Sequence, residues 1–214
     1  MRGMVGEVAG AALLGGSALM AYAVRGRSSQ LFCPSVWHGP RDKRAIALTF
    51  DDGPSEGTPR ILDLLEEYGV HATFFMRGAA VGCLPEVARR VAAGGHDVGN
   101  HAFSHQRLFL RTPRFVKEEV RRAQEIILDA AGVAPKYFRA PYGGRWFGLR
   151  SVQRELDLLH VMWTRIGRDW TWPADRVAKR LLRAAENGAI FCLHDGRGAA
   201  PNPDISTTIE AARI

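Results

Sequence analysis

The stretch ALTFDDGPSEGTP, residues 47–59, places two acidic residues side by side directly after a short apolar run. Residues 45–50 are typical of a short strand. Thr58-Pro59 is typical of a helix start, with a cap hydroxyl followed by proline at the first helical position. The neighbouring carboxylates of Asp51 and Asp52 repel each other unless a cation lies beside them. The stretch therefore predicts a strand, an acidic turn and a helix. We also expect a positively charged group beside the acid pair.

The rest of the chain alternates between strand-like and helix-like segments. Further strands are predicted over residues 72–76, 96–99, 137–139, 158–163 and 189–194. Helices are predicted over residues 58–68, 85–93, 112–131, 149–156 and 174–186. This alternation indicates a parallel sheet or barrel of the α/β class.

Chemically reactive residues follow several of these predicted strands. Asp51 and Asp52 end the first strand, and His101, Arg139 and His194 lie at the ends of others. Parallel α/β folds assemble their sites at the edge where the carboxyl ends of the strands meet. We therefore expect these distant residues to converge on one pocket.

Length and composition favour one domain with one core. The chain has 214 residues, of which 46% are hydrophobic, and this is too short for two comfortable domains. Its formal net charge of +7 fits an anionic partner such as lipid or a cell-wall polymer. The basic residues are scattered over helical stretches without an aromatic-rich basic motif, so we expect no binding to nucleic acid.

The three cysteines, Cys33, Cys83 and Cys192, form no close pair. A zinc ribbon or a disulfide framework is therefore not indicated. Cys192 lies in an apolar run and is expected to pack as a small hydrophobic residue. A bridge between Cys33 and Cys83 stays open.

The N-terminal segment is apolar. Residues 8–24 carry no charge, and arginines flank them on both sides. A cleaved export signal, an uncleaved anchor and a helix buried in the domain are three alternatives; the first two are favoured because the segment has no polar face. Ala21-Tyr22-Ala23 offers a cleavage pattern. We therefore predict a signal or membrane anchor over residues 1–27, a linker over 28–42, a catalytic domain over 43–214 and an extracytoplasmic location.

Two histidines form a candidate metal site with one of the acids. In NHAFSH, residues 100–105, His101 and His105 are four apart, and on one helical turn both rings would face the same way. Two imidazoles and a carboxylate make a three-ligand site with open positions. A bound cation would also hold down the charge of the acid pair, leaving the second carboxylate as general base, with Arg139 to fix it. Taken alone, the acid pair could equally be an Asp-Gly turn.

Three further motifs add candidate catalytic groups. RAPYGG, residues 139–144, ends a strand in a rigid turn that could present a backbone N–H to an oxyanion. His194 in CLHDG suits a general acid, and Asp169 in GRDWTW suits a carboxylate that orients and charges it. Trp170 and Trp172 could stack on a sugar or fill the core.

Taken in order, TFDDGP, HAFSH, RAPYGG, RDW and LHD resemble the five motifs of the polysaccharide deacetylase family, carbohydrate esterase family 4. The resemblance runs from about residue 43 to the C-terminus. It implies a distorted (β/α) barrel of about seven strands. It also implies a metal-dependent hydrolase that removes N-acetyl groups from a glycan containing N-acetylglucosamine, such as chitin or peptidoglycan, and releases acetate. The enzyme would use one divalent metal ion. We expect zinc, and cobalt, nickel, manganese and iron are the alternatives.

The same resemblance implies a role for each motif residue. Asp51 resembles the general base and His194 the general acid, with Arg139 positioning the base and Asp169 tuning the acid. The implied metal ligands are Asp52, His101 and His105, and the implied substrate-binding residues are Pro141, Tyr142 with its backbone N–H, Trp170 and Leu193.

The sequence departs from the family pattern in two places. Ile166 stands where the fourth motif often has an acid, and the chain ends at TIEAARI, inside the helix expected before a last strand. We therefore expect a barrel that is incomplete at this end. The alternatives are a relative that hydrolyses a non-sugar amide or cyclic imide, a glycan-binding module without activity, and an iron oxygenase, which would need neither Asp51 nor His194.

Overall fold

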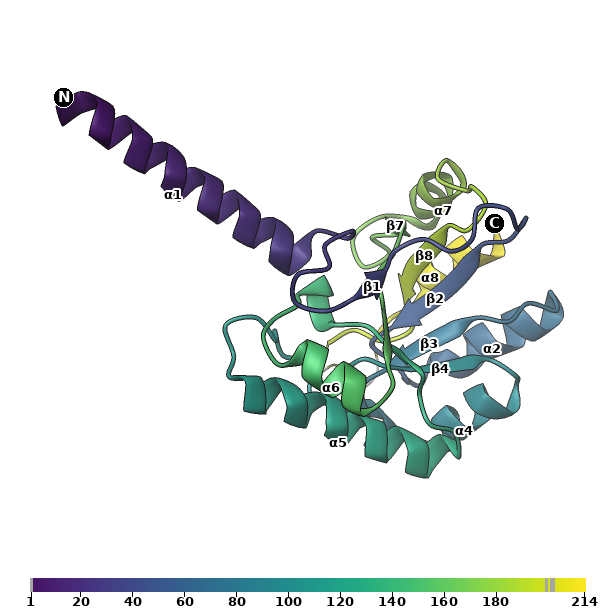
Figure 1. The fold of residues 1–214 in the computed structure, drawn as a ribbon. Coiled ribbons are helices and arrows are strands. Elements are labelled where there is room, and N and C mark those ends of the chain that lie inside the picture. The colour runs from purple at the N-terminus through teal and green to yellow at the C-terminus, as the bar shows by residue number, and fades with distance from the viewer. Residues whose placement is uncertain (1, 199, 201–202) are drawn as a thin grey trace.

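Eight parallel strands form the centre of the protein (Figure 1). The computed structural model describes residues 2–198, 200 and 203–214, with the side chains of the first helix from residue 14 onward. The sheet order is β1-β6-β5-β4-β3-β2-β8-β7. The strands are β1 (Ser35–Val36), β2 (Ala47–Asp51), β3 (Thr73–Met76), β4 (Asp97–Asn100), β5 (Tyr137–Phe138), β6 (Leu159–Val161), β7 (Arg165–Ile166) and β8 (Ile190–His194).

The sheet curls on itself because β6 and β7 are nearly one strand. Only residues 162–164 separate them, yet β6 pairs with β5 near one end of the sheet and β7 pairs with β8 at the other end. The two ends of the sheet are therefore brought together by one short piece of chain. This confirms the predicted distorted (β/α) barrel, with eight strands in place of about seven.

Helices connect the strands and cover the outside of the barrel. They are α1 (Arg2–Arg25), α2 (Thr58–Glu67), α3 (Gly78–Cys83), α4 (Pro85–Ala93), α5 (Pro113–Ala131), α6 (Leu149–Glu155), α7 (Ala174–Leu182) and α8 (Ser206–Arg213), with a 3₁₀ turn at Pro141–Gly143. Thr112 caps α5, because its side chain accepts the Phe115 N–H, and Gly132 ends it in a left-handed conformation with φ 73°. The predicted Thr58 cap is wrong: Gly57 is the N-cap residue, and the Thr58 hydroxyl instead accepts the Ser55 N–H.

The main core lies between the sheet and its helices. Phe50 and Phe74, on neighbouring strands, are fully buried and stack with their ring centroids 5.1 Å apart. Ile61 from α2, Ile127 from α5 and Ile209 from α8 belong to the same buried cluster. The cluster fixes β2, β3 and β8 side by side, so the residues at the ends of these strands have defined positions.

Residues 28–42, interpreted as a linker, pack against the barrel. They contribute β1, and both Ser29 and Ser35 are buried. The fully buried Arg145 donates to the Ser29 carbonyl at 2.6 Å and to Ser35 Oγ at 2.8 Å. The local sequence, which is polar and rich in turn residues, does not indicate these contacts with Arg145, and it therefore predicted a linker.

The first helix extends away from the barrel (Figure 1). Its side chains are exposed from Leu14 to Tyr22, whereas Ala23 and Val24 are buried at its base. The side chains from Leu14 to Tyr22 are therefore not buried in the domain. None of the helices in the described part of the chain is long and apolar enough to cross a membrane.

The C-terminal residues form α8, which packs against α7 and α2. Thr208, Ile209 and Ala211 of α8 are buried. All three cysteines are free, with Cys33 and Cys192 buried and Cys83 exposed, so the bridge left open between Cys33 and Cys83 is not formed.

Candidate active site

The carboxyl ends of the strands surround a cleft of about 700 Å³. The acid pair, the two motif histidines and His194 line it together with Tyr142, Trp163, Ile166 and Trp170. Asp51 ends β2 and His194 ends β8, and the two residues are paired in the sheet register. The predicted convergence of these strand ends is therefore confirmed.

Asp52, His101 and His105 form the candidate metal site. Asp52 Oδ1 lies 3.3 Å from His101 Nε2 and 2.8 Å from His105 Nε2. All three side chains offer ligand atoms within 4.8 Å of one another. The expected helical turn between the histidines is wrong: the segment is irregular, with left-handed φ values of 61° at Ala102 and 60° at His105. The loop nevertheless brings both rings together, with centroids 5.1 Å apart.

The hydrogen bonding of this trio fits a metal ion. His101 Nδ1 lies 2.7 Å from the Arg139 carbonyl, which can only accept, so Nδ1 is the donor and Nε2 is the ring atom that a metal would use, facing Asp52. Asp52 Oδ1 is buried and has no hydrogen-bond partner in the described part of the chain. A carboxylate oxygen and an imidazole lone pair that face each other, with a second imidazole beside them, form a ligand set that a divalent cation would bridge.

Electrostatics also prepare these ligands for a cation. Burial raises the pKa of Asp52, but the adjacent imidazoles of His101 and His105 outweigh it and hold the pKa well below its usual range. Burial lowers the pKa of His105, more than Asp52 raises it. A charged carboxylate with a neutral imidazole is the protonation state that binds metal.

Arg139 fixes Asp51 in place. Its Nη1 donates to Asp51 Oδ1 at 2.6 Å and to Thr49 Oγ1 at 2.7 Å. Its Nε and Nη2 donate to the carbonyls of Val161 and Met162 at 3.0 and 3.1 Å. The guanidinium is fully buried, and these four hydrogen bonds together hold it in one position. Arg139 therefore supplies a positive partner for the acid pair, through Asp51.

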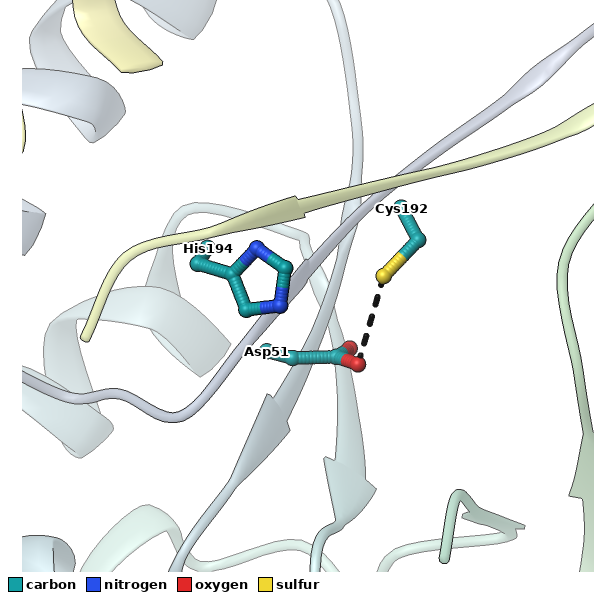
Figure 2. A group of neighbouring side chains, drawn as sticks. All are labelled: Asp51, Cys192 and His194. Carbon is teal, nitrogen blue, oxygen red and sulfur yellow. Dashed lines mark hydrogen bonds between the residues drawn. The ribbon is translucent and has the colours of Figure 1, made fainter. Parts of the chain in front are cut away.

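Cys192 contacts the other oxygen of Asp51. Figure 2 shows the thiol directed at this carboxylate, with Sγ 3.4 Å from Oδ2 and the His194 ring beside it. Asp51, Cys192 and His194 are close enough to hold an ion. They suit one poorly, because burial strongly raises the pKa of the thiol and Arg139 already occupies Oδ1. Cys192 thus acts here as a weak donor to Asp51, a contact that the sequence did not indicate.

Asp169 holds and charges His194. Its Oδ1 lies 2.9 Å from His194 Nδ1, and its Oδ2 accepts the His194 backbone N–H at 2.8 Å. Burial lowers the pKa of His194, but the hydrogen bond and charge of Asp169, with the charges of Asp51 and Asp52, raise it to about 9. His194 is therefore an imidazolium at neutral pH, with its Nε2 proton available to a ligand in the cleft.

Two supporting residues were missed by the sequence analysis. Thr208, buried on α8, donates from Oγ1 to Asp169 Oδ2 at 2.7 Å. Asp195 accepts the Gly53 N–H at 3.1 Å and the Thr58 hydroxyl at 2.7 Å, which ties the end of β8 to the acidic turn. Asp195 stands beside His194 in the motif and could have been noticed. Nothing in the sequence around Thr208 indicates that α8 reaches Asp169.

The remaining predicted residues are divided between the cleft and the core. Tyr142 has a left-handed φ of 56°, and its ring lies 4.6 Å from that of His105. Trp170 meets His194 edge to face at 4.8 Å. Leu193 and Pro141 are buried and do not line the cleft. Ile166 stands where the fourth motif often has an acid, and its carbonyl accepts a hydrogen bond from Arg180 Nε at 2.8 Å.

The geometry defines a hydrolytic site with a three-ligand metal position, a fixed carboxylate and a charged histidine on a parallel barrel. A family model described as polysaccharide deacetylase matches residues 38–161. The protein belongs to the polysaccharide deacetylase family.

Known relatives cover most of the chain. A chitooligosaccharide deacetylase of Bradyrhizobium sp. is 41% identical over 72% of this chain and 71% of its own length. A peptidoglycan-N-acetylglucosamine deacetylase of Bacillus cereus is 35% identical over 76% of this chain and 60% of its own length. The solved structure of the Bc1960 peptidoglycan N-acetylglucosamine deacetylase superposes with a TM-score of 0.76 at 32% identity, covering 82% of this chain and 81% of that one.

Proposed function

We propose that this protein is a metal-dependent deacetylase that hydrolyses N-acetyl groups of a glycan containing N-acetylglucosamine and releases acetate. The observation that carries the proposal is the pair of oriented proton-transfer groups beside one metal position: Asp51 held by Arg139, and His194 charged by Asp169. A general base and a general acid facing the same cleft are what hydrolysis of an amide requires. The names of the two relatives, which act on chitooligosaccharide and peptidoglycan, support the substrate class.

The proposed reaction uses each group once. A divalent ion held by Asp52, His101 and His105 would polarise the amide carbonyl and acidify water. Asp51 accepts a proton as the water oxygen bonds to the carbonyl carbon. His194 then gives its proton to the amide nitrogen as the carbon–nitrogen bond breaks, leaving the sugar amine and acetate. Tyr142 lies beside His105 and its N–H is a candidate donor to the oxyanion.

Zinc is the proposed metal. Two imidazoles and one carboxylate with open positions are a typical catalytic zinc set, and cobalt, nickel, manganese and iron accept the same ligands. Stripping the protein with a chelator should abolish acetate release from N-acetylglucosamine oligomers and from peptidoglycan, and adding zinc or cobalt should restore it. The metal should also raise the melting temperature, because it binds only the folded state. A folded sample that binds metal and releases no acetate from either substrate would refute the deacetylase proposal.

Thr208 is expected to support catalysis through Asp169. Thr208→Val keeps the shape but removes the hydroxyl, so Asp169 Oδ2 loses one of its two fixing bonds. We expect kcat to fall about ten-fold, the lower end of the value of one hydrogen bond to a charged group because Thr208 acts through Asp169, and the alkaline limb of the pH profile to move to lower pH. Thr208→Ser should keep wild-type behaviour. Equal losses in both variants would show that Thr208 serves only packing.

We also propose an extracytoplasmic location, with the N-terminal segment as the export element. The apolar stretch, residues 8–24, supports this, as does the polymeric glycan substrate. A fusion of residues 1–42 to a reporter that is active only after export tests the proposal. An inactive reporter from a well-expressed fusion would contradict it.

A further inference from the structure

We propose that one face of this protein, at the base of α1, binds the surface of a membrane that contains anionic phospholipid. We call this face the collar. This inference goes beyond the proposed hydrolysis, because it concerns the surface to which the protein binds and not the bond that it cleaves. The collar consists of Arg25, Leu31, Leu110, Arg111, Arg114 and Phe147.

Three segments that are distant in sequence meet at the collar. The Phe32 ring lies 4.9 Å from the Phe147 ring. Phe109 lies under the guanidinium of Arg25, 5.5 Å from its ring centroid, and packs against Gly144. The end of α1, the loop before α5 and the loop before α6 therefore form one continuous surface. Figure 1 shows the end of α1 and α6 on the same side of the barrel.

The collar exposes large apolar side chains. The exposed fractions are 76% for Leu110 and 57% for both Leu31 and Phe147. The adjoining side chains of α1, from Leu14 to Tyr22, are exposed as well. Single exposed apolar residues are ordinary on a protein surface, whereas a group of them on one face indicates a binding partner.

The charged side chains of the collar are all basic. The sequence has no acidic residue between Glu7 and Asp42, between Asp97 and Glu118, or between Asp129 and Glu155, and these intervals contain all three segments. Arg25, Arg111 and Arg114 therefore point to an anionic partner. A bilayer with anionic headgroups takes up both the arginines and the leucine and phenylalanine side chains, whereas a soluble polyanion has no apolar interior.

The collar adjoins the cleft. Arg25 lines the cleft that holds the acid pair, and it belongs to the collar through Phe109. A protein bound by its collar would therefore present the mouth of the cleft close to the lipid surface. This placement favours glycan strands that lie next to a membrane.

Flotation of the full chain with lipid vesicles tests the proposal. Vesicles of phosphatidylcholine with phosphatidylglycerol should bind the protein, and pure phosphatidylcholine should bind it far less. Arg111→Gln with Arg114→Gln should lower partitioning about 25-fold, since each arginine near an anionic surface contributes about five-fold. Leu110→Ser with Phe147→Ser should lower it at least about ten-fold. Both pairs should leave acetate release from soluble oligomers unchanged.

Matched pairs on other faces are the controls. Arg89→Gln with Arg183→Gln removes two exposed charges, and Tyr68→Ser with Leu182→Ser removes two exposed apolar side chains. Neither control pair should change partitioning. Binding that survives both collar pairs would assign it to α1 alone and overturn the proposal. So would equal losses in the control pairs, equal binding to neutral vesicles, or binding to a soluble polyanion without binding to vesicles.

Discussion

Asp51→Asn is expected to lower kcat by about 10²- to 10⁴-fold, the usual contribution of a general base, while the metal content of the protein stays unchanged. The side chain keeps its shape, and its carbonyl oxygen can still accept the Arg139 hydrogen bond that now measures 2.6 Å. What it loses is the ability to take a proton. The three proposed metal ligands are not altered, so chelator titration should give the same stoichiometry as for the wild type.

Two companion variants make this result specific. Asp52→Asn should show the opposite pattern, with loss of bound metal, because its Oδ1 faces both histidines. Thr49→Val removes the second acceptor of Arg139 Nη1 but leaves Asp51 in place, and it should retain most of the activity. Metal loss in Asp51→Asn, or full turnover by that variant, would contradict the division of roles between the two acids.

The roles of the acids illustrate how far sequence reasoning reaches. A strand followed by two acids is readable locally, and strand ends in a parallel fold meet at one edge, so the convergence with His101 and His194 could be predicted. Chemistry then required a cation near the pair. The division into base and ligand came from the family resemblance alone, and local sequence does not show that Arg139 holds Asp51 while both histidines face Asp52.

Other features were beyond sequence reasoning because they depend on tertiary contacts. The histidine spacing suggested a helical turn, but left-handed backbone at Ala102 and His105 makes the approach instead. The polar residues before β1 looked like a linker because the buried guanidinium that binds them, Arg145, lies more than a hundred residues away. The support of Asp169 by Thr208 has the same origin. Each case is a buried polar contact between distant segments, which hydrophobic periodicity does not report.

Asp169→Asn is expected to lower kcat at pH 7 by about 10²- to 10⁴-fold by removing the charge on His194. Asp169 and its hydrogen bond raise the pKa of His194 to about 9 against the effect of burial. With a neutral amide in its place, burial lowers the pKa and only the charges of Asp51 and Asp52 still raise it, so the pKa should fall well below 9. Less of the imidazole would then carry the proton that the leaving nitrogen needs at pH 7.

The pH dependence distinguishes this cause from a general loss of structure. Wild-type activity should decline as the pH rises through about 9, where His194 loses its proton, and the alkaline limb of the variant should move to lower pH. Stability should follow the same group. Because the folded pKa of His194 is raised, its contribution is complete below pH 6.5 and lost as the pH rises through about 9. Melting temperatures measured across this range should therefore fall more for the wild type than for Asp169→Asn. An alkaline limb that stays in place in the variant would remove His194 from the role of general acid.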